Sequence, residues 1–302
     1  HELTLPINRD KLSFAKLRHP DKIFVGGKWI APATSDRFAV VSAHSEEVVV
    51  SVAKAGQADV EMAADSARRA FDVGPWPRMS PVERAEYVRR LSDALAPRMP
   101  DVARAWVDQI GALSIAAPVV TGGGKFWFDY YADLAARYAW DTEVPRFDGQ
   151  GIAKIVKEPV GVVAAIAPWN NPFGIMTGKV APALVAGCTV VMKPAPETPI
   201  EAYILAEAIE EVGFPDGVVN LVCADREASD RLVRSPAIDK VSFTGSVAAG
   251  RIIGMACAER FARCTLELGG KSAAIVLEDA DVEMAGAMLA NVITLSAGQV
   301  CA

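Results

Sequence analysis

The chain has 302 residues and a formal net charge of −6 at pH 7, with 51% hydrophobic and 23% charged residues. This length suits one large α/β domain or two smaller domains, and an acidic chain without a cluster of lysines and arginines is not expected to bind nucleic acid. The sequence has no apolar run long enough to cross a bilayer, and its five scattered cysteines predict neither a metal site nor a disulfide framework, which favours the cytoplasm.

The N-terminal part of the chain is expected to be an irregular arm followed by helices. The stretch "FVGGKWI" predicts a strand that turns at Gly26-Gly27. Helices are predicted at about 57–71, from Ser80 onward, and at roughly 101–116. The second of these opens with Ser-Pro-x-Glu, which is the spacing of a capping box with proline at the first helical position.

The stretch "TGGGKFWFDYYADLAARYAW" predicts a glycine turn that leads into an aromatic helix. Its aromatic side chains are expected to lie in the core, and a ligand contact by one of them is the less favoured reading. Residues 141–158 alternate between polar and apolar positions, which predicts a β-hairpin that projects from the domain.

From residue 160 onward, the pattern changes to apolar strands separated by helices. Strands are predicted near 160, 189, 218 and 240, and each is followed by a helical stretch. Continuous runs of valine, alanine and isoleucine that alternate with helices are typical of a parallel, doubly wound sheet covered on both faces. The expected fold class is therefore α/β, and ligands are expected at the carboxyl ends of the strands.

Two of these strand ends carry unusual residues. Asn170, in "PWNNP", has a side-chain amide that suits an oxyanion donor, although asparagine and proline are also ordinary turn residues. Lys193, in "KPAPETP", can bind nucleotide hydroxyls or phosphate at the end of its strand, or it can be a solvated lysine.

Further candidates follow toward the C-terminus. Gly245-Ser246 precedes a predicted helix, whose free N–H groups can bind a pyrophosphate, although no G-x-G-x-x-G motif is present. Glu267, in "LELGGK", is a carboxylate within an apolar strand, and it is either a general base or half of an ion pair. Cys301, in "SAGQVCA", is either a nucleophile or a thiol on a loose tail.

Taken together in this order, the motifs "PWNNP", "KPAPETP", "FTGS", "LELGGK" and "GQVC" resemble the NAD(P)-dependent aldehyde dehydrogenase superfamily. The resemblance extends from "FVGGKWI" to Cys301. It implies that the chain corresponds to the N-terminal three fifths of a family member and ends just after the catalytic cysteine. The resemblance implies the following domains: 1–140, the arm and helices of the cofactor-binding domain; 141–158, an oligomerisation hairpin; 159–266, a Rossmann-like cofactor-binding domain; and 267–302, the beginning of a truncated α/β catalytic domain.

The resemblance also implies the catalytic roles. Cys301 would be the nucleophile that forms a thiohemiacetal and then a thioester, and Asn170 would hold the oxyanion. Glu267 would activate the water that hydrolyses the thioester to a carboxylic acid. Lys179, in "GKVAPAL", matches a lysine near the proton-relay region.

For the cofactor, the resemblance implies NAD, with NADP possible. Many members carry a ribose-binding glutamate where Pro196 stands here, and no extra arginine or lysine nearby would receive a 2′-phosphate. The implied cofactor-binding residues are Ile166, Pro168, Trp169, Lys193, Gly245, Ser246 and Leu268.

The implied partners are a small-molecule aldehyde and further copies of the chain, as a homodimer or homotetramer. The sequence predicts no nucleic-acid, membrane or metal partner. The alternative function is that of a catalytically inactive fragment that binds nucleotide or takes part in assembly.

Overall fold

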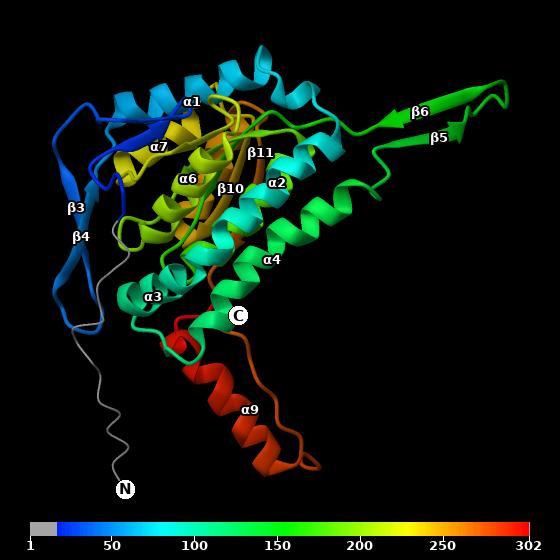
Figure 1. Cartoon of the computed structure of the whole chain (residues 1–302). Helices are drawn as coiled ribbons and strands as arrows, with labels where there is room; N and C mark the ends of the chain where they lie inside the picture. The colour runs from blue at the N-terminus through cyan, green and yellow to red at the C-terminus, as the bar shows by residue number, and fades with distance from the viewer. Residues whose placement is uncertain (1–16, 302) are drawn as a thin grey trace, which may run out of the picture.

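A seven-stranded sheet forms the centre of the molecule (Figure 1). The computed structural model describes residues 17–301, so the first sixteen residues of the predicted arm lie outside the described residues. The strand order is β11-β10-β7-β8-β9-β1-β2. The strands of this sheet are β1 (Ile23–Val25), β2 (Lys28–Ile30), β7 (Val162–Ile166), β8 (Thr189–Lys193), β9 (Val219–Leu221), β10 (Lys240–Gly245) and β11 (Arg263–Leu268).

The predicted parallel sheet is confirmed for β7 to β11, and β1 and β2 extend it in an antiparallel sense. The turn between β1 and β2 uses Gly26 and Gly27, both at positive φ, where glycine is favoured because it lacks a Cβ atom. The sequence predicted this turn but not that its strands would join the main sheet. The predicted boundary at 266 falls inside β11, which continues to Leu268.

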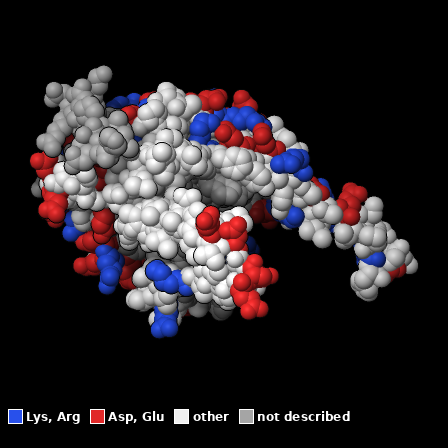
Figure 2. Space-filling model, turned by 90° about the horizontal axis from the view of Figure 1, so that it is seen from below, with Lys and Arg blue, Asp and Glu red and all other residues white. Residues whose placement is uncertain are grey.

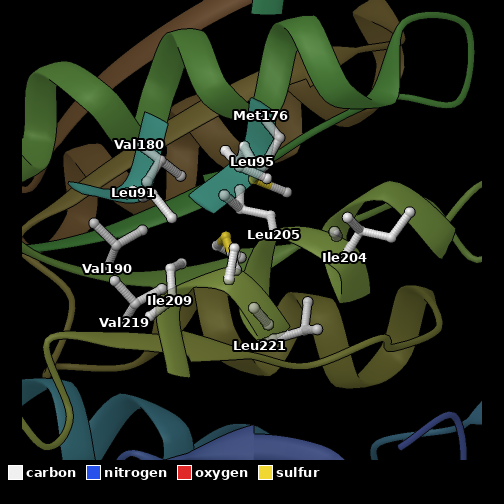
Figure 3. Packing of buried hydrophobic residues seen from close by; sticks show 14 of the residues in the cluster. Leu91, Leu95, Met176, Val180, Val190, Ile204, Leu205, Ile209, Val219 and Leu221 are labelled. Carbon is white, nitrogen blue, oxygen red and sulfur yellow. The ribbon is translucent and has the colours of Figure 1, made fainter. Parts of the chain in front are cut away.

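Helices cover both faces of the sheet, as the continuous apolar strands predicted. One core contains side chains from α2, α4, α5 and α6, and Figure 3 shows its packing around Leu205. The other core contains side chains from α1, α7 and α8. The helices are α1 (Gln57–Asp72), α2 (Pro81–Leu95), α3 (Met99–Ile110), α4 (Ala117–Ala135), α5 (Pro172–Ala186), α6 (Ile200–Val212), α7 (Arg226–Arg234), α8 (Val247–Glu259) and α9 (Val282–Thr294).

The capping box at the start of α2 is confirmed. The Ser80 hydroxyl accepts a hydrogen bond from the Glu83 N–H at 3.2 Å, and the Glu83 carboxylate accepts one from the Ser80 N–H at 2.7 Å. In contrast, the helix predicted over 101–116 is wrong at its end. It stops at Ile110, because Gly111 takes the left-handed conformation that terminates many helices.

The predicted glycine turn before the aromatic helix is also wrong, because α4 runs through Gly122, Gly123 and Gly124. A Cβ atom on Gly124 would lie 2.5 Å from the Phe173 ring, so this glycine lets α4 pack closely on α5. The aromatics of α4 are not all in the core as predicted. Phe128 is buried, whereas others on this helix or just after it are exposed: Phe126, Trp127, Tyr130 and Tyr138.

The predicted hairpin is confirmed as β5 (Asp141–Pro145) paired with β6 (Ile152–Val156), and it projects from the body of the molecule (Figure 1). A further hairpin pairs β3 (Arg37–Val41) with β4 (Val48–Ala53). Within residues 17–301, no helix has the length and hydropathy to span a membrane. In the same residues, no group of three or more His, Cys, Asp and Glu side chains is arranged to bind a metal ion.

The segment after β11 is much less buried than the sheet. Helix α9 contains no buried residue. Its exposed apolar side chains include Met284, Met288 and Val292, and Ile275 and Leu277 before it are also exposed. Figure 2 views the molecule from the end where α9 lies, and most of the atoms in the middle of this view belong to uncharged residues.

Candidate functional site

The carboxyl ends of the parallel strands meet at one edge of the sheet and bring several predicted residues together. Ile166 ends β7 and is in register with Lys193 at the end of β8 and with Phe243 in β10. Gly245 of β10 is in register with Leu268 of β11. This edge is where open α/β sheets bind their ligands.

Lys193 is partly buried at this edge. Burial lowers the pKa of its ammonium group, and the nearby Cys223, Glu197 and Asp225 act in the opposite direction. Asp225 forms an ion pair with Lys54 at 2.9 Å, so its charge is already shared. A cation with few neutralising partners at a strand end suits a hydroxyl or phosphate oxygen of a nucleotide.

The first turn of α8 begins directly after Gly245. Ser246 is the N-cap residue, and its hydroxyl accepts a hydrogen bond from the Ala249 N–H at 3.2 Å. The N–H groups of the first residues of a helix have no partner within the helix, and they carry its positive dipole end. Leu268 packs against this helix at Gly250, so the strand edge and the helix start form one corner whose N–H groups suit an anion.

The segment between β7 and α5 carries Asn170. The side-chain amide of Asn170 donates a hydrogen bond to the backbone carbonyl of Gln299 at 2.8 Å. The backbone carbonyl of Asn170 accepts a hydrogen bond from the Trp106 indole at 3.2 Å. Trp106 is fully buried in α3, which fixes the backbone at this point. The neighbouring Trp169 is 44% exposed, so its ring is available to a ligand at the strand edge.

Asn171 has a structural role that the sequence did not reveal. Its side-chain oxygen accepts a hydrogen bond from the Gly174 N–H at 3.2 Å and so caps α5. This cap fixes where α5 begins, and therefore also where Asn170 lies.

Cys301 is exposed and lies beside the glycine pair that follows β11. The carbonyl oxygen of Cys301 is 3.6 Å from the place that a Cβ atom on Gly270 would occupy. The chain segment that leads to Cys301 is held by Gln299, whose side-chain amide donates hydrogen bonds to the carbonyls of Ile110 and Ser296, each at 2.9 Å. Asn170, Gly270 and Cys301 are therefore gathered in one place.

The turn before Cys301 is strained. Ser296 and Ala297 both have positive φ, at 50° and 54°, which residues with a Cβ atom rarely adopt. Such conformations persist where neighbouring contacts hold them, and they are frequent at functional sites. The Gln299 hydrogen bonds are contacts of this kind.

Glu267 and Lys179 lie close to each other on one face of the sheet. Burial lowers the pKa of Lys179 to about 8, and the negative charge of Glu267 partly opposes this shift. The Lys179 ammonium donates a hydrogen bond to the Ser242 hydroxyl at 3.3 Å. Glu267 is exposed, and its carboxylate forms no hydrogen bond or ion pair within residues 17–301. The Glu267 carboxylate is therefore available to a water molecule. The nearby Lys179 is the cation that the ion-pair alternative would involve, but the two groups form no ion pair.

The contacts made by Trp106, Gln299 and Ser242 were missed by the sequence reasoning. Gln299 belongs to a motif that the sequence did single out, but its hydrogen bond to Ile110 joins distant parts of the chain. Ser242 lies in an apolar strand, and only the alternation of side chains along β10 places it on the same face as Lys179.

The residues at this edge fit a dinucleotide. They offer a helix N-terminus for a pyrophosphate, a partly buried cation at Lys193, and apolar side chains at Ile166, Pro168 and Leu268 against which rings can lie. The Glu267 carboxylate adjoins this edge near Lys179 of α5, and the backbone of the exposed Cys301 lies beside Gly270.

Comparison with known proteins shows the family to which the chain belongs. Residues 29–302 match the sequence model of the aldehyde dehydrogenase family. The chain is 43% identical to geranial dehydrogenase of Castellaniella defragrans over 92% of its own length and 58% of that protein's, and 37% identical to phenylacetaldehyde dehydrogenase of Pseudomonas fluorescens over 99% and 61%.

Solved structures give the same result. An aldehyde dehydrogenase of Mycobacterium tuberculosis complexed with NAD+ superposes with a TM-score of 0.87 at 42% identity, covering 93% of this chain and 58% of that one. A variant of aldehyde dehydrogenase C of Pseudomonas syringae in complex with NAD+ and octanal gives 0.89 at 35% identity, covering 95% and 58%. The chain thus spans about three fifths of the length of these relatives. Its matched residues, fold and identity to these proteins place the chain in the aldehyde dehydrogenase family.

Proposed function

We propose that this chain carries the cofactor site and the catalytic cysteine of an enzyme that oxidises an aldehyde to a carboxylic acid with NAD(P)+. The observation that carries the proposal is the convergence of Asn170, Gly270 and Cys301 next to the carboxyl edge of the sheet. An amide donor bonded to the segment that carries a thiol suits the formation and stabilisation of a tetrahedral oxyanion.

In the first step, the Cys301 sulfur attacks the carbonyl carbon of the aldehyde as a thiolate and gives a thiohemiacetal. The Asn170 amide has two N–H groups, and the Gln299 carbonyl occupies one of them. The second is free to donate to the oxyanion. The hydrogen bond to Gln299 thus orients the donor at the same time as it holds the segment that carries the nucleophile.

The residues that would hold NAD(P)+ are Ile166, Pro168, Trp169, Lys193, Gly245, Ser246 and Leu268. The cofactor would supply a hydride acceptor, and loss of hydride from the thiohemiacetal would leave the acyl group on Cys301 as a thioester. The ribose of the cofactor would lie at Lys193 and its pyrophosphate at Ser246. NAD is the preferred form, because acidic Glu197 and Asp225 lie near Lys193 at the predicted ribose position. These carboxylates would oppose a 2′-phosphate.

Hydrolysis then requires a base. The Glu267 carboxylate takes a proton from water, the hydroxide attacks the thioester carbon, and the carboxylic acid leaves as the Cys301 thiolate is released. Lys179, with a pKa of about 8, lies near Glu267 and can exchange its proton with the carboxylate at neutral pH. Ser242 orients the Lys179 ammonium for this exchange.

The remaining assignments also belong to this proposal. Residues 141–158 would mediate a homodimer or homotetramer, since the hairpin projects and its side chains in β6 are all exposed. Residues 267–302 would begin a catalytic domain, which the exposure of α9 supports. A cytoplasmic location is consistent with five free cysteines.

The test is a comparison of Cys301→Ala and Glu267→Gln in the protein that contains this chain. Cys301→Ala should abolish aldehyde-dependent formation of reduced nicotinamide. Glu267→Gln should give a single burst of product and a protein with an acyl group on Cys301, detected by intact mass. Full turnover by either variant would overturn the assignment. Nucleotide binding without any turnover by the unmodified 302-residue chain would instead support the alternative of a non-catalytic fragment.

A further inference from the structure

Helix α8 packs on β11 in a regular register. A Cβ atom on Gly250 would lie 2.5 Å from the Leu268 side chain, and one on Gly254 would lie 3.6 Å from the Leu266 side chain. Residues four apart on a helix share a face, and alternate residues of a strand share a face. The two glycines therefore bring one face of α8 against one face of β11.

The same register continues to a pair of cysteines. Cys257 lies one turn beyond Gly254 in α8, and Cys264 lies two residues before Leu266 in β11. The chain reverses tightly between them, because the Ala262 N–H donates a hydrogen bond to the Cys257 carbonyl at 2.9 Å and Phe261 takes a positive φ. Cys264 has the same parity in β11 as Leu266 and Leu268, so its side chain lies on the face of the strand that packs on α8, toward Cys257.

The two thiols differ in their access to solvent. Cys257 is 1% exposed and packs in the core, whereas Cys264 is exposed at the edge strand of the sheet. Burial raises the pKa of the Cys257 thiol, and the adjacent Cys264 raises it further. Cys264 is therefore the thiol that a dissolved reagent meets first, and Cys257 is the thiol behind it.

We propose that Cys257 and Cys264 form an oxidisable dithiol, a modification site separate from the nucleophile Cys301, that closes to an intramolecular disulfide when a hydroperoxide reaches Cys264. In the first step, the Cys264 sulfur displaces water from hydrogen peroxide and becomes a sulfenic acid. In the second, the Cys257 sulfur attacks that sulfur, and a second water leaves as the S–S bond forms. Two thiols are oxidised by two electrons, and one peroxide is reduced to two waters.

The location gives the disulfide a defined consequence. Cys257 lies near the opposite end of α8 from Ser246, and Cys264 lies near the opposite end of β11 from Glu267. Closure would tie the helix to the strand without touching either residue. It would also keep Cys264 from proceeding to the irreversible sulfinic acid, because a nearby second thiol resolves the sulfenic acid.

Trypsin makes the test direct, because Arg260 and Arg263 separate the two cysteines into different peptides. Native Cys301→Ser protein is treated with hydrogen peroxide, the remaining thiols are alkylated after denaturation, and the digest is analysed by mass spectrometry. We expect the loss of two alkylatable thiols and a peptide pair joined through Cys257 and Cys264. Treatment with a thiol reductant should restore both.

Matched variants identify the order of the steps. In Cys257→Ser protein, Cys264 should accumulate as a sulfenic acid that dimedone traps, and no linked pair should form. In Cys264→Ser protein, Cys257 should remain a thiol, and replacement of the buried Cys188 should change nothing. The proposal is overturned if native Cys264 forms sulfinic acid or links only to another chain while Cys257 stays reduced, or if the Cys264→Ser variant loses the Cys257 thiol equally fast.

Discussion

The strands β7 and β8 and the segment around α9 lie in the same chain, but they are held by different forces. Every residue of β7 is buried, whereas α9 has no buried residue. The cofactor edge is therefore positioned by the packing of two apolar cores. Cys301 is positioned by a few polar contacts instead, chiefly those that Gln299 makes with Asn170 and Ile110.

This difference shows how one catalytic site can combine a rigid half with a weakly held half. Burial of apolar area fixes the strand ends to within the tolerance of close packing. A hydrogen bond contributes only about 0.5–1.5 kcal/mol net, so the strained turn at Ser296 and Ala297 depends on several bonds acting together. The position of Cys301 should consequently respond to changes in Gln299 that leave the sheet unaffected.

The largest expected effect is the difference in unfolding free energy when an apolar side chain is truncated in each of the two regions. Leu205→Ala, in the core shown in Figure 3, should lower the free energy of unfolding by about 2–5 kcal/mol, since it leaves a cavity. Met288→Ala on α9, where the side chain is 63% exposed, should change it by less than about 0.5 kcal/mol. Urea unfolding measures both, and equal losses would contradict the division into a packed and an open region.

A buried carboxyl group should make the stability of the packed region depend on pH. Glu201 is fully buried in α6; one of its oxygens has no partner among residues 17–301, and the other accepts a hydrogen bond from Gln109 at 2.6 Å. Burial raises the pKa of Glu201 from 4.5 to about 8. The folded state therefore binds the proton more tightly than the unfolded state.

Because this pKa is raised, its contribution to stability is complete below pH 4.5, declines as the pH rises toward about 8, and is constant above that. Glu201→Gln should remove this decline and stabilise the protein at alkaline pH by an amount of the order of a few kcal/mol. Urea midpoints measured for both proteins at acidic and alkaline pH test this. Parallel pH profiles would show that Glu201 does not hold a proton in the core.

The smallest expected effect distinguishes two neighbouring glycines of α4. Gly124→Ala would place a methyl group 2.5 Å from the Phe173 ring, which should destabilise the protein by about 1–3 kcal/mol. Gly123→Ala has no atom within 4 Å of the new methyl group, so it should stabilise the helix by about 0.5–1 kcal/mol. Thermal unfolding of the two variants should shift in opposite directions, and a shift of the same sign would mean that α4 and α5 are not packed as described.

The strands could be predicted from the sequence because their apolar runs are continuous and their flanks carry turn residues. The strands found from Val162, Thr189, Val219 and Lys240 begin within a few residues of the predicted positions. The helix ends were harder, because Gly111 terminates α3 through its backbone conformation, while Gly124 lies inside a helix and owes its place to Phe173. A glycine can therefore end a helix or lie within one, and only tertiary contacts distinguish the two cases.

The candidate site was predicted as a set of residues but not as a set of contacts. Asn170, Glu267 and Cys301 stand in recognisable motifs. However, the bond from Asn170 to Gln299 and the bond from Lys179 to Ser242 join segments far apart in the chain. No local pattern reports such a contact, which depends on the order in which strands are arranged in the sheet.

The carboxyl edge of the sheet, which the packed region builds, is proposed to bind a dinucleotide. The most direct test is calorimetric titration of the 302-residue chain with NAD+, with Lys193→Ala and a control, Lys154→Ala, on the exposed hairpin strand β6. We predict saturable binding by the unmodified chain and by the control, and at least about tenfold weaker binding, or about 1.4 kcal/mol, by Lys193→Ala. Absence of binding, or equal affinity of all three proteins, would contradict the assignment of this edge.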